Sequence, residues 1–194
     1  MKTTLFTLAT IATIATTNAQ TFTVDTDQSK VMWHAEKVTG EHDGHVNVKS
    51  GELVMTDGKL SGGKFTMDMT SIVCTDLEGE WKEKLETHLR SADFFSVQKH
   101  PTAEFVMSKV VHEGKDRYKV EGKMTIKKIT KDVKFLAFVS EEGGEVSGNA
   151  DITMDRTDFD IRYGSGSFFD DLGDKTIYDE FTLKVELTAS KAGN

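Results

Sequence analysis

The sequence predicts an all-β fold: an extended eight-stranded antiparallel barrel covered by one amphipathic helix. Apolar and polar residues alternate through most of the chain, which is the period of half-buried strands. Short turn signals such as Asp57-Gly58, a pair suited to the positive φ angles of tight hairpins, separate the alternating runs. Only residues 76–92 show a helical period instead. With about eight one-faced strands, a closed barrel is favoured because closure leaves no strand edge exposed.

Residues 1–19 are predicted to be a signal peptide that is removed on export. Lys2 gives a short basic start, Leu5–Ala15 is mostly apolar, and Thr17-Asn18-Ala19 has the small-x-small pattern of a cleavage site. The apolar run is too short to cross a bilayer. We therefore expect a periplasmic or secreted protein, not an integral membrane protein, with residues 20–194 as one domain.

The net charge of the chain restricts the partners that it can bind, and its single cysteine excludes stabilisation by an intramolecular disulfide. The chain carries 24 Lys and Arg against 32 Asp and Glu, a net charge of −8, and the loss of Lys2 makes the mature chain one unit more negative. That balance argues against nucleic acid and anionic membrane surfaces, which select basic patches. The single cysteine, Cys74, has no partner for an intramolecular disulfide, and its apolar surroundings favour a buried, inert thiol.

The strands follow one another with one apolar face each. The alternating runs are residues 31–35, 65–69, 103–107, 118–126, 133–139, 146–154 and 181–187. Methionine and phenylalanine recur on the apolar faces, and methionine adapts to flexible apolar partners. An eight-stranded barrel either is filled by its own side chains or holds one small ligand. The pattern alone leaves both interpretations open.

The predicted helix covers residues 76–92. Trp81, Leu85 and Leu89 fall at i, i+4 and i+8, and charged residues occupy most other positions. The segment is either a surface helix packed for stability or a mobile lid. Phe94-Phe95 is expected to dock it, and Pro101 to end the crossing before the next strand.

The sequence gives only weak evidence for a catalytic or metal-binding site. Residues 41–45 hold two imidazoles and two carboxylates, but they fall on a predicted glycine turn, and no thiolate completes a zinc set. We expect a solvated loop there and no metal site. Residues 164–167 lack the spacing of a nucleophile elbow, and the acidic residues of 151–160 lack the pattern of a calcium loop. The sequence predicts a protein that is not an enzyme and needs no cofactor.

The segments Trp33, Thr39–Gly44, Leu53–Met69, His88–Phe95, Pro101–Phe105, Tyr118–Ile126 and Met154–Phe159 follow one another in a specific order. In that order they resemble the YceI-like family of lipid-binding, lipocalin-like proteins. The resemblance implies a lipocalin-like barrel whose pore holds a polyisoprenoid or a similar amphiphile, such as an isoprenoid quinone, with the helix lying across the barrel. Lys127-Lys128 stands where the family usually has His-Gly, and Asp160 stands where a glycine is usual.

These expectations combine into one hypothesis and one alternative. An apolar tail would lie among seven pore residues, and each buried CH₂ would contribute about 0.8 kcal/mol. The alternative is a filled-barrel, stress-related protein that acts through protein contacts, which an exposed Phe168-Phe169 patch would favour. Carriage, storage and a homodimer all remain open. The pore residues are Trp33, Phe65, Met67, Phe105, Met107, Met124 and Phe135, and the head-group candidates are His42, His45 and Arg156.

Overall fold

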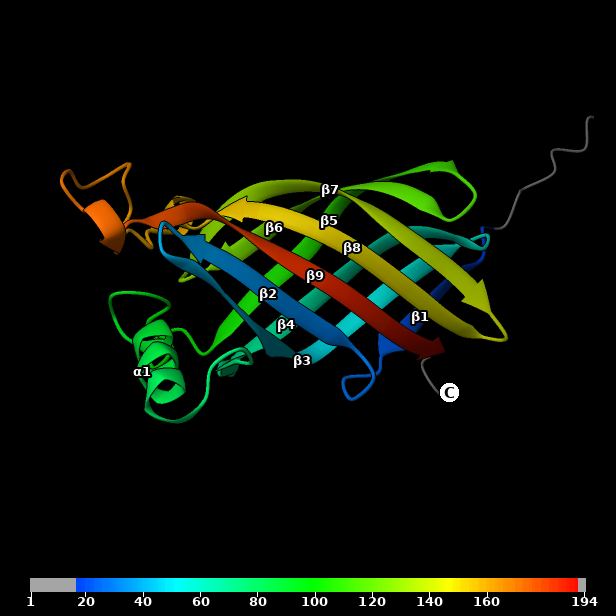
Figure 1. Cartoon of the computed structure of the whole chain (residues 1–194). Coiled ribbons are helices and arrows are strands. Elements are labelled where there is room, and N and C mark those ends of the chain that lie inside the picture. Colours follow the sequence, from blue (N-terminus) through cyan, green and yellow to red (C-terminus); the bar gives the residue numbers. More distant parts are fainter. Residues whose placement is uncertain (1–16, 192–194) are drawn as a thin grey trace, which may run out of the picture.

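The protein is described by a computed structural model that covers residues 17–191. Nine strands form one antiparallel sheet, and β3 pairs with β4 as well as with β2, which closes the sheet into an elongated barrel (Figure 1). The predicted signal peptide lies almost entirely outside the described residues. The strands are β1 Ala19–Val24, β2 Lys30–Lys37, β3 Gly40–Thr56, β4 Lys59–Cys74, β5 Thr102–Gly114, β6 Arg117–Ile126, β7 Ile129–Glu142, β8 Glu145–Asp155 and β9 Ile177–Lys191.

Two short strands share one position around the barrel. At one end of the barrel, β1 pairs with residues 52–56 of β3 and residues 189–191 of β9. Towards the other end, β2 pairs with residues 40–46 of β3 and with residues 177–186 of β9. The nine strands therefore occupy eight positions, and the predicted eight-stranded antiparallel barrel is confirmed.

The tight turns follow the expected chemistry, with one informative exception. Asp57 and Gly58 join β3 to β4 with φ angles of 50° and 73°, the two positive values that an Asp-Gly hairpin turn needs. The turn between β6 and β7 adopts the same backbone without glycine, because Lys127 and Lys128 have φ angles of 52° and 65°. Asp160, which follows the 3₁₀ helix η1 (Arg156–Phe159), also has a positive φ of 57°.

Strand β3 corrects the prediction for residues 39–45. Instead of a glycine turn, these residues enter a strand at Gly40, and the preceding turn is confined to residues 38 and 39. The alternation was hidden because the register against β4 shifts between His45 and Asn47 and again between Val48 and Ser50. Such bulges move one residue out of step, so inward and outward positions no longer follow a simple period of two.

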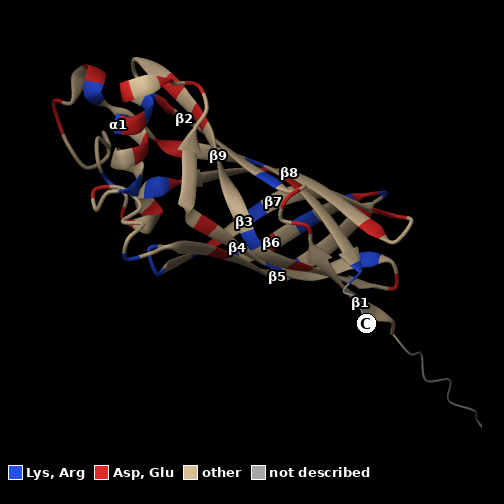
Figure 2. Ribbon diagram, turned by 90° about the horizontal axis from the view of Figure 1, so that it is seen from below, with Lys and Arg blue, Asp and Glu red and all other residues tan. Residues whose placement is uncertain are grey.

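The helix α1 (Gly79–Arg90) lies at the end of the barrel opposite β1 (Figure 1). It is shorter than predicted because Gly79 has a φ of 56° and Ser91 is extended. Leu89 is buried, but Trp81 is 71% exposed, so its placement on the apolar stripe was wrong. Charges of both signs are interspersed over α1 and the outside of the strands (Figure 2). Within residues 17–191, no helix is long and apolar enough to cross a membrane.

Candidate functional site

The barrel interior holds two adjoining cavities. The inner cavity, about 90 Å³, lies in the middle of the barrel, and apart from Gly148 and Asn149 its lining residues are apolar. The mouth cavity, about 300 Å³, lies under α1. Both cavities are lined by Val31, Met67, Met124 and Leu183, so they adjoin along the barrel.

The seven pore residues named from the sequence all line these cavities. Trp33 lines the mouth cavity and Met67 and Met124 line both, while the remaining four line the inner cavity. Phe105 and Phe135 face each other there, with ring centroids 5.5 Å apart. The strand alternation placed these side chains correctly because inward positions of a barrel are set by the pleat. The four inner-cavity residues are Phe65, Phe105, Met107 and Phe135.

A roof of aromatic and apolar side chains covers the mouth cavity. It is formed by α1 and the loop after it on one side, and by the segment around Tyr163 and Tyr178 on the other. The two sides meet where the rings of His88 and Tyr163 lie edge to face with centroids 4.3 Å apart. Phe94 is buried beneath this contact, as expected for a residue that docks the helix. The roof residues contributed by α1 and its loop are Leu85, His88, Leu89, Phe94 and Phe95.

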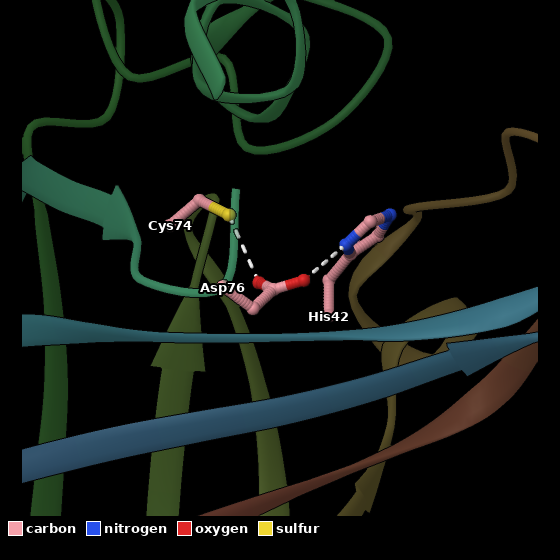
Figure 3. Close-up of side chains that lie close together, drawn as sticks. All are labelled: His42, Cys74 and Asp76. Atoms are coloured by element: carbon pink, nitrogen blue, oxygen red, sulfur yellow. Dashed lines mark hydrogen bonds and ion pairs between the residues drawn. The ribbon is translucent and has the colours of Figure 1, made fainter. Parts of the chain in front are cut away.

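His42 lines the mouth cavity, and a neighbouring carboxylate holds its ring in place. Its Nδ1 lies 2.9 Å from Oδ2 of Asp76, and Oδ1 of that carboxylate accepts a hydrogen bond from the Cys74 thiol at 3.0 Å (Figure 3). The same Oδ1 also accepts a hydrogen bond from the Asp43 backbone N–H at 2.9 Å. Burial alone would raise the pKa of Asp76, but these hydrogen bonds together hold the pKa at about 2. Asp76 is therefore a carboxylate at neutral pH and orients the imidazole.

Cys74 is fully buried, as the sequence predicted, and has no disulfide partner. Burial raises the pKa of its thiol, and the hydrogen bond to the Asp76 carboxylate raises it further. Both effects favour the protonated thiol, which is a poor nucleophile.

The other two head-group candidates are placed differently from the prediction. His45 lies on the outer face of β3, opposite Met32 in the register with β2, so it does not face the cavities. Its assignment as a head-group contact was wrong because the region is a strand, and residues 42 and 45 of a strand point to opposite faces.

Arg156 lines the mouth cavity, but all of its N–H donors already form hydrogen bonds within the protein. It is 4% exposed, and its five N–H donors are taken by the carbonyls of Ile161, Tyr163, Ile177 and Tyr178 and by Asp179. A guanidinium has five donors in total. Arg156 therefore holds residues 161–179 against β8 and has no donor left for a head group.

Comparison with known proteins decides the family. The YceI-like domain profile matches residues 22–189, which is nearly the whole described chain. The chain belongs to the YceI-like family. A UPF0312 protein of Pseudomonas putida (strain W619) is 36% identical over 114 residues, covering 52% of this chain and 59% of that protein. A UPF0312 protein of Vibrio parahaemolyticus is 31% identical over 134 residues, covering 66% and 69%.

Solved structures show the same fold. BcnA of Burkholderia cenocepacia superimposes with a TM-score of 0.67 at 24% identity, over 86% of this YceI-like chain and 99% of that protein. A polyisoprenoid-binding domain from Saccharophagus degradans gives a TM-score of 0.66 at 10% identity, over 88% and 98%. At these identities the similarity establishes the barrel and its helix.

Sequence reasoning missed the connection of His42 with Cys74 and Asp76 in this YceI-like protein. The three residues come from β3, the end of β4 and the link to α1, and they are up to 34 residues apart. The register pair of Gly44 with Cys74, together with a hydrogen bond from the Thr75 N–H to the Asp43 carbonyl, brings them together. No local motif signals a contact that depends on a bulged strand register.

Proposed function

We propose that the protein is an exported binding protein that holds one polyisoprenoid, isoprenoid quinone or similar amphiphilic lipid in its two adjoining cavities, for carriage or storage. Membership of the YceI-like family supports binding over catalysis. The observation that carries the proposal is the apolar interior itself, which extends from the roof under α1 into the middle of the barrel. The mouth cavity of about 300 Å³ falls within the range of small-molecule sites.

The arrangement separates an apolar end from a polar one. The hydrocarbon tail would lie in the inner cavity, where burial of each CH₂ contributes about 0.8 kcal/mol. Its polar end would lie in the mouth cavity near His42. Since Asp76 occupies Nδ1, Nε2 is the nitrogen of that ring left for a ligand. The Trp33 indole Nε1 is buried at this wall and, within residues 17–191, has no hydrogen-bond partner. A hydroxyl or quinone carbonyl would suit these groups.

Native mass spectrometry of gently purified protein tests the proposal directly. We expect a bound species of lipid mass that is released on denaturation, or stoichiometric uptake of an isoprenoid quinone or polyprenol by the empty protein. A protein that is isolated empty and takes up neither class of lipid would contradict the proposal.

Filling the mouth cavity should abolish binding without unfolding the barrel. Ala35 is half-buried and lines the mouth cavity, so Ala35→Phe adds a ring where the ligand would lie. We expect at least a tenfold loss of affinity for a short-chain ubiquinone, measured by fluorescence or calorimetric titration. Met32→Phe is the matched control, because Met32 lies on the outer face of the same strand. Equal affinities of the two variants would place the ligand elsewhere.

A second function is favoured by one observation. Phe168 and Phe169 are 46% and 51% exposed, the condition stated above for a protein that acts through protein contacts. In that alternative the cavities would be packing defects without a ligand. In that case, replacing both Phe168 and Phe169 by serine would abolish binding of the partner protein, and Ala35→Phe would leave that binding intact. Loss of lipid binding in Ala35→Phe, with lipid binding kept in the double-serine variant, supports the lipid-binding proposal instead.

Export is part of the proposal. It rests on the signal-peptide pattern of residues 1–19. Amino-terminal sequencing of protein recovered from a periplasmic or culture fraction should find Gln20 first, and retention of the intact leader in the cytoplasm would contradict it.

A further inference from the structure

The residues around Asp76 offer a ligand set for a transition metal. The Cys74 sulfur, one His42 ring nitrogen and one Asp76 oxygen all lie within 4.8 Å of one another. In tetrahedral zinc sites, bond lengths of about 2.0–2.3 Å place neighbouring ligand atoms roughly 3.3–3.6 Å apart. The thiol and the imidazole contact the two oxygens of the Asp76 carboxylate at 3.0 Å and 2.9 Å, so a side-chain rotation that directs one oxygen between them would bring all three ligands around an ion.

We propose that His42, Cys74 and Asp76 form a binding site for one zinc ion at the edge of the mouth cavity, with a water molecule as the fourth ligand. The donor set combines thiolate, imidazole and carboxylate, which suits zinc more than calcium or magnesium. The zinc site shares His42 with the mouth cavity, but its test needs no lipid.

The backbone holds the three ligands in place before any ion arrives. The Asp43 N–H binds Asp76, and the Cys74 N–H donates to Oε1 of Glu86 on α1 at 3.0 Å. The Thr75 N–H donates to the Asp43 carbonyl at 2.8 Å and fixes the link against β3. Outer hydrogen bonds of this kind orient metal ligands and raise affinity by about 10- to 100-fold.

An ion can reach the site from solvent. The side chains of His42 and Asp76 are 28% and 30% exposed, whereas Cys74 is fully buried and would supply its sulfur from the protein side. Binding forms metal–sulfur, metal–nitrogen and metal–oxygen bonds and releases the thiol proton of Cys74 to solvent. A neutral His42 keeps its single proton, which moves to Nε2 when Nδ1 binds the ion. The thiolate and the carboxylate then balance the two positive charges of zinc.

A second acidic group on the same hairpin differs in one decisive respect. His34, Glu36 and Glu41 also lie within 4.8 Å of one another, but this group contains no thiol. His34 is already bound by Asp43 at 2.9 Å and by Glu36 at 3.3 Å. Sulfur ligation therefore distinguishes the proposed site from this neighbour.

Cobalt substitution tests the proposal with a readout specific for sulfur. Reduced protein freed of metal by a chelator is titrated with Co²⁺ and then with Zn²⁺. We expect one Co²⁺ per chain, with a sulfur-to-cobalt charge-transfer band that disappears as Zn²⁺ displaces it. Cys74→Ser should abolish the band, and His42→Ala and Asp76→Asn should weaken Zn²⁺ binding about 100-fold or more. His45→Ala and His34→Ala are the controls and should leave it unchanged.

Two results would overturn the proposal. One is the absence of a charge-transfer band in the native sequence, which needs no variant and so does not depend on whether Cys74→Ser folds. The other is zinc binding that is lost in His34→Ala but retained in Cys74→Ser. Circular dichroism of each variant establishes that the barrel is intact before binding is compared.

Discussion

At Trp33, the wall of the mouth cavity depends on the neighbouring residue Gly44, which has no side chain. A Cβ on Gly44 would lie 2.3 Å from Cζ2 of the Trp33 ring and 2.0 Å from the Val73 carbonyl oxygen. Neither distance is possible, so the indole can pack beside this part of β3 only because residue 44 is glycine. The shape of the cavity wall therefore depends on that glycine.

Gly44→Ala is predicted to destabilise the barrel by about 2–3 kcal/mol or more, since overpacking of a fixed core costs about 1–3 kcal/mol and one contact here is backbone. Urea unfolding measures the change. Gly148→Ala is the control, because the nearest atom to its added Cβ is 3.6 Å away. An unchanged midpoint for Gly44→Ala would mean that Trp33 and β4 move aside freely.

Arg156 is predicted to act through stability and not through the ligand. Arg156→Lys reduces five donors to three and leaves at least two of its partners unpaired, at about 1–3 kcal/mol each. We expect a loss of about 2–5 kcal/mol in the free energy of unfolding. Arg162→Lys is the control: Arg162 is 52% exposed, pairs with Asp160 and has its guanidinium 4.5 Å from the centre of the Phe168 ring, and lysine can keep both exposed contacts, so its substitution should change stability by less than about 1 kcal/mol. Equal unfolding midpoints for both variants would contradict the structural role of Arg156.

At the scale of elements, the β6–β7 turn carries avoidable strain. Lys127 and Lys128 both adopt left-handed backbone angles, which cost a residue with a Cβ about 1–2 kcal/mol. Lys128 stands where the family resemblance implied glycine, and Asp160, the second departure from the family pattern, has a positive φ too. The two departures thus fall at positions where glycine would be unstrained.

Lys128→Gly is predicted to stabilise the protein by about 0.5–1 kcal/mol, since relief of strain exceeds the added freedom of the unfolded chain. For a protein of this size, that corresponds to a rise in Tm of about 1–4 °C by calorimetry. Lys134→Gly, in the middle of the extended strand β7, should lower Tm instead. A fall in Tm for both variants would show that the turn is not strained.

The sequence predicted the strand segments in which apolar and polar residues alternate regularly, and missed a segment in which bulges interrupt that alternation. Strands such as β6 were predicted because every second residue from Tyr118 to Ile126 faces the core. The start of β3 was missed because its bulges break that period, and with it the opposite orientations of His42 and His45 were missed. The prediction that Trp81 lies on the buried face of α1 was wrong, because Trp81 is exposed. A spacing of four residues predicts which residues share a helix face, but not where the barrel beneath the helix ends. The pore residues could be predicted from alternation, whereas the cluster around Asp76 needed three-dimensional register.

For the whole molecule, a ligand that fits the cavities should stabilise the barrel as a unit. Binding at 100 times the dissociation constant adds about 2.7 kcal/mol to the free energy of unfolding. For a protein of this size, Tm should then rise by about 5–10 °C. Calorimetry with and without a short-chain ubiquinone measures this shift, and Ala35→Phe should show none. A shift of equal size in that variant would point to binding on the outside of the barrel.

The division of one barrel position between β1 and β2 has a practical consequence. Because β1 pairs with both β3 and the last residues of β9, the two ends of the described chain lie at the same end of the barrel, opposite α1 (Figure 1). A tag or surface anchor attached at either terminus would therefore point away from the roofed opening. Molecules immobilised on a sensor chip in this way would all present that opening to the flowing solution, with neither attachment obstructing it.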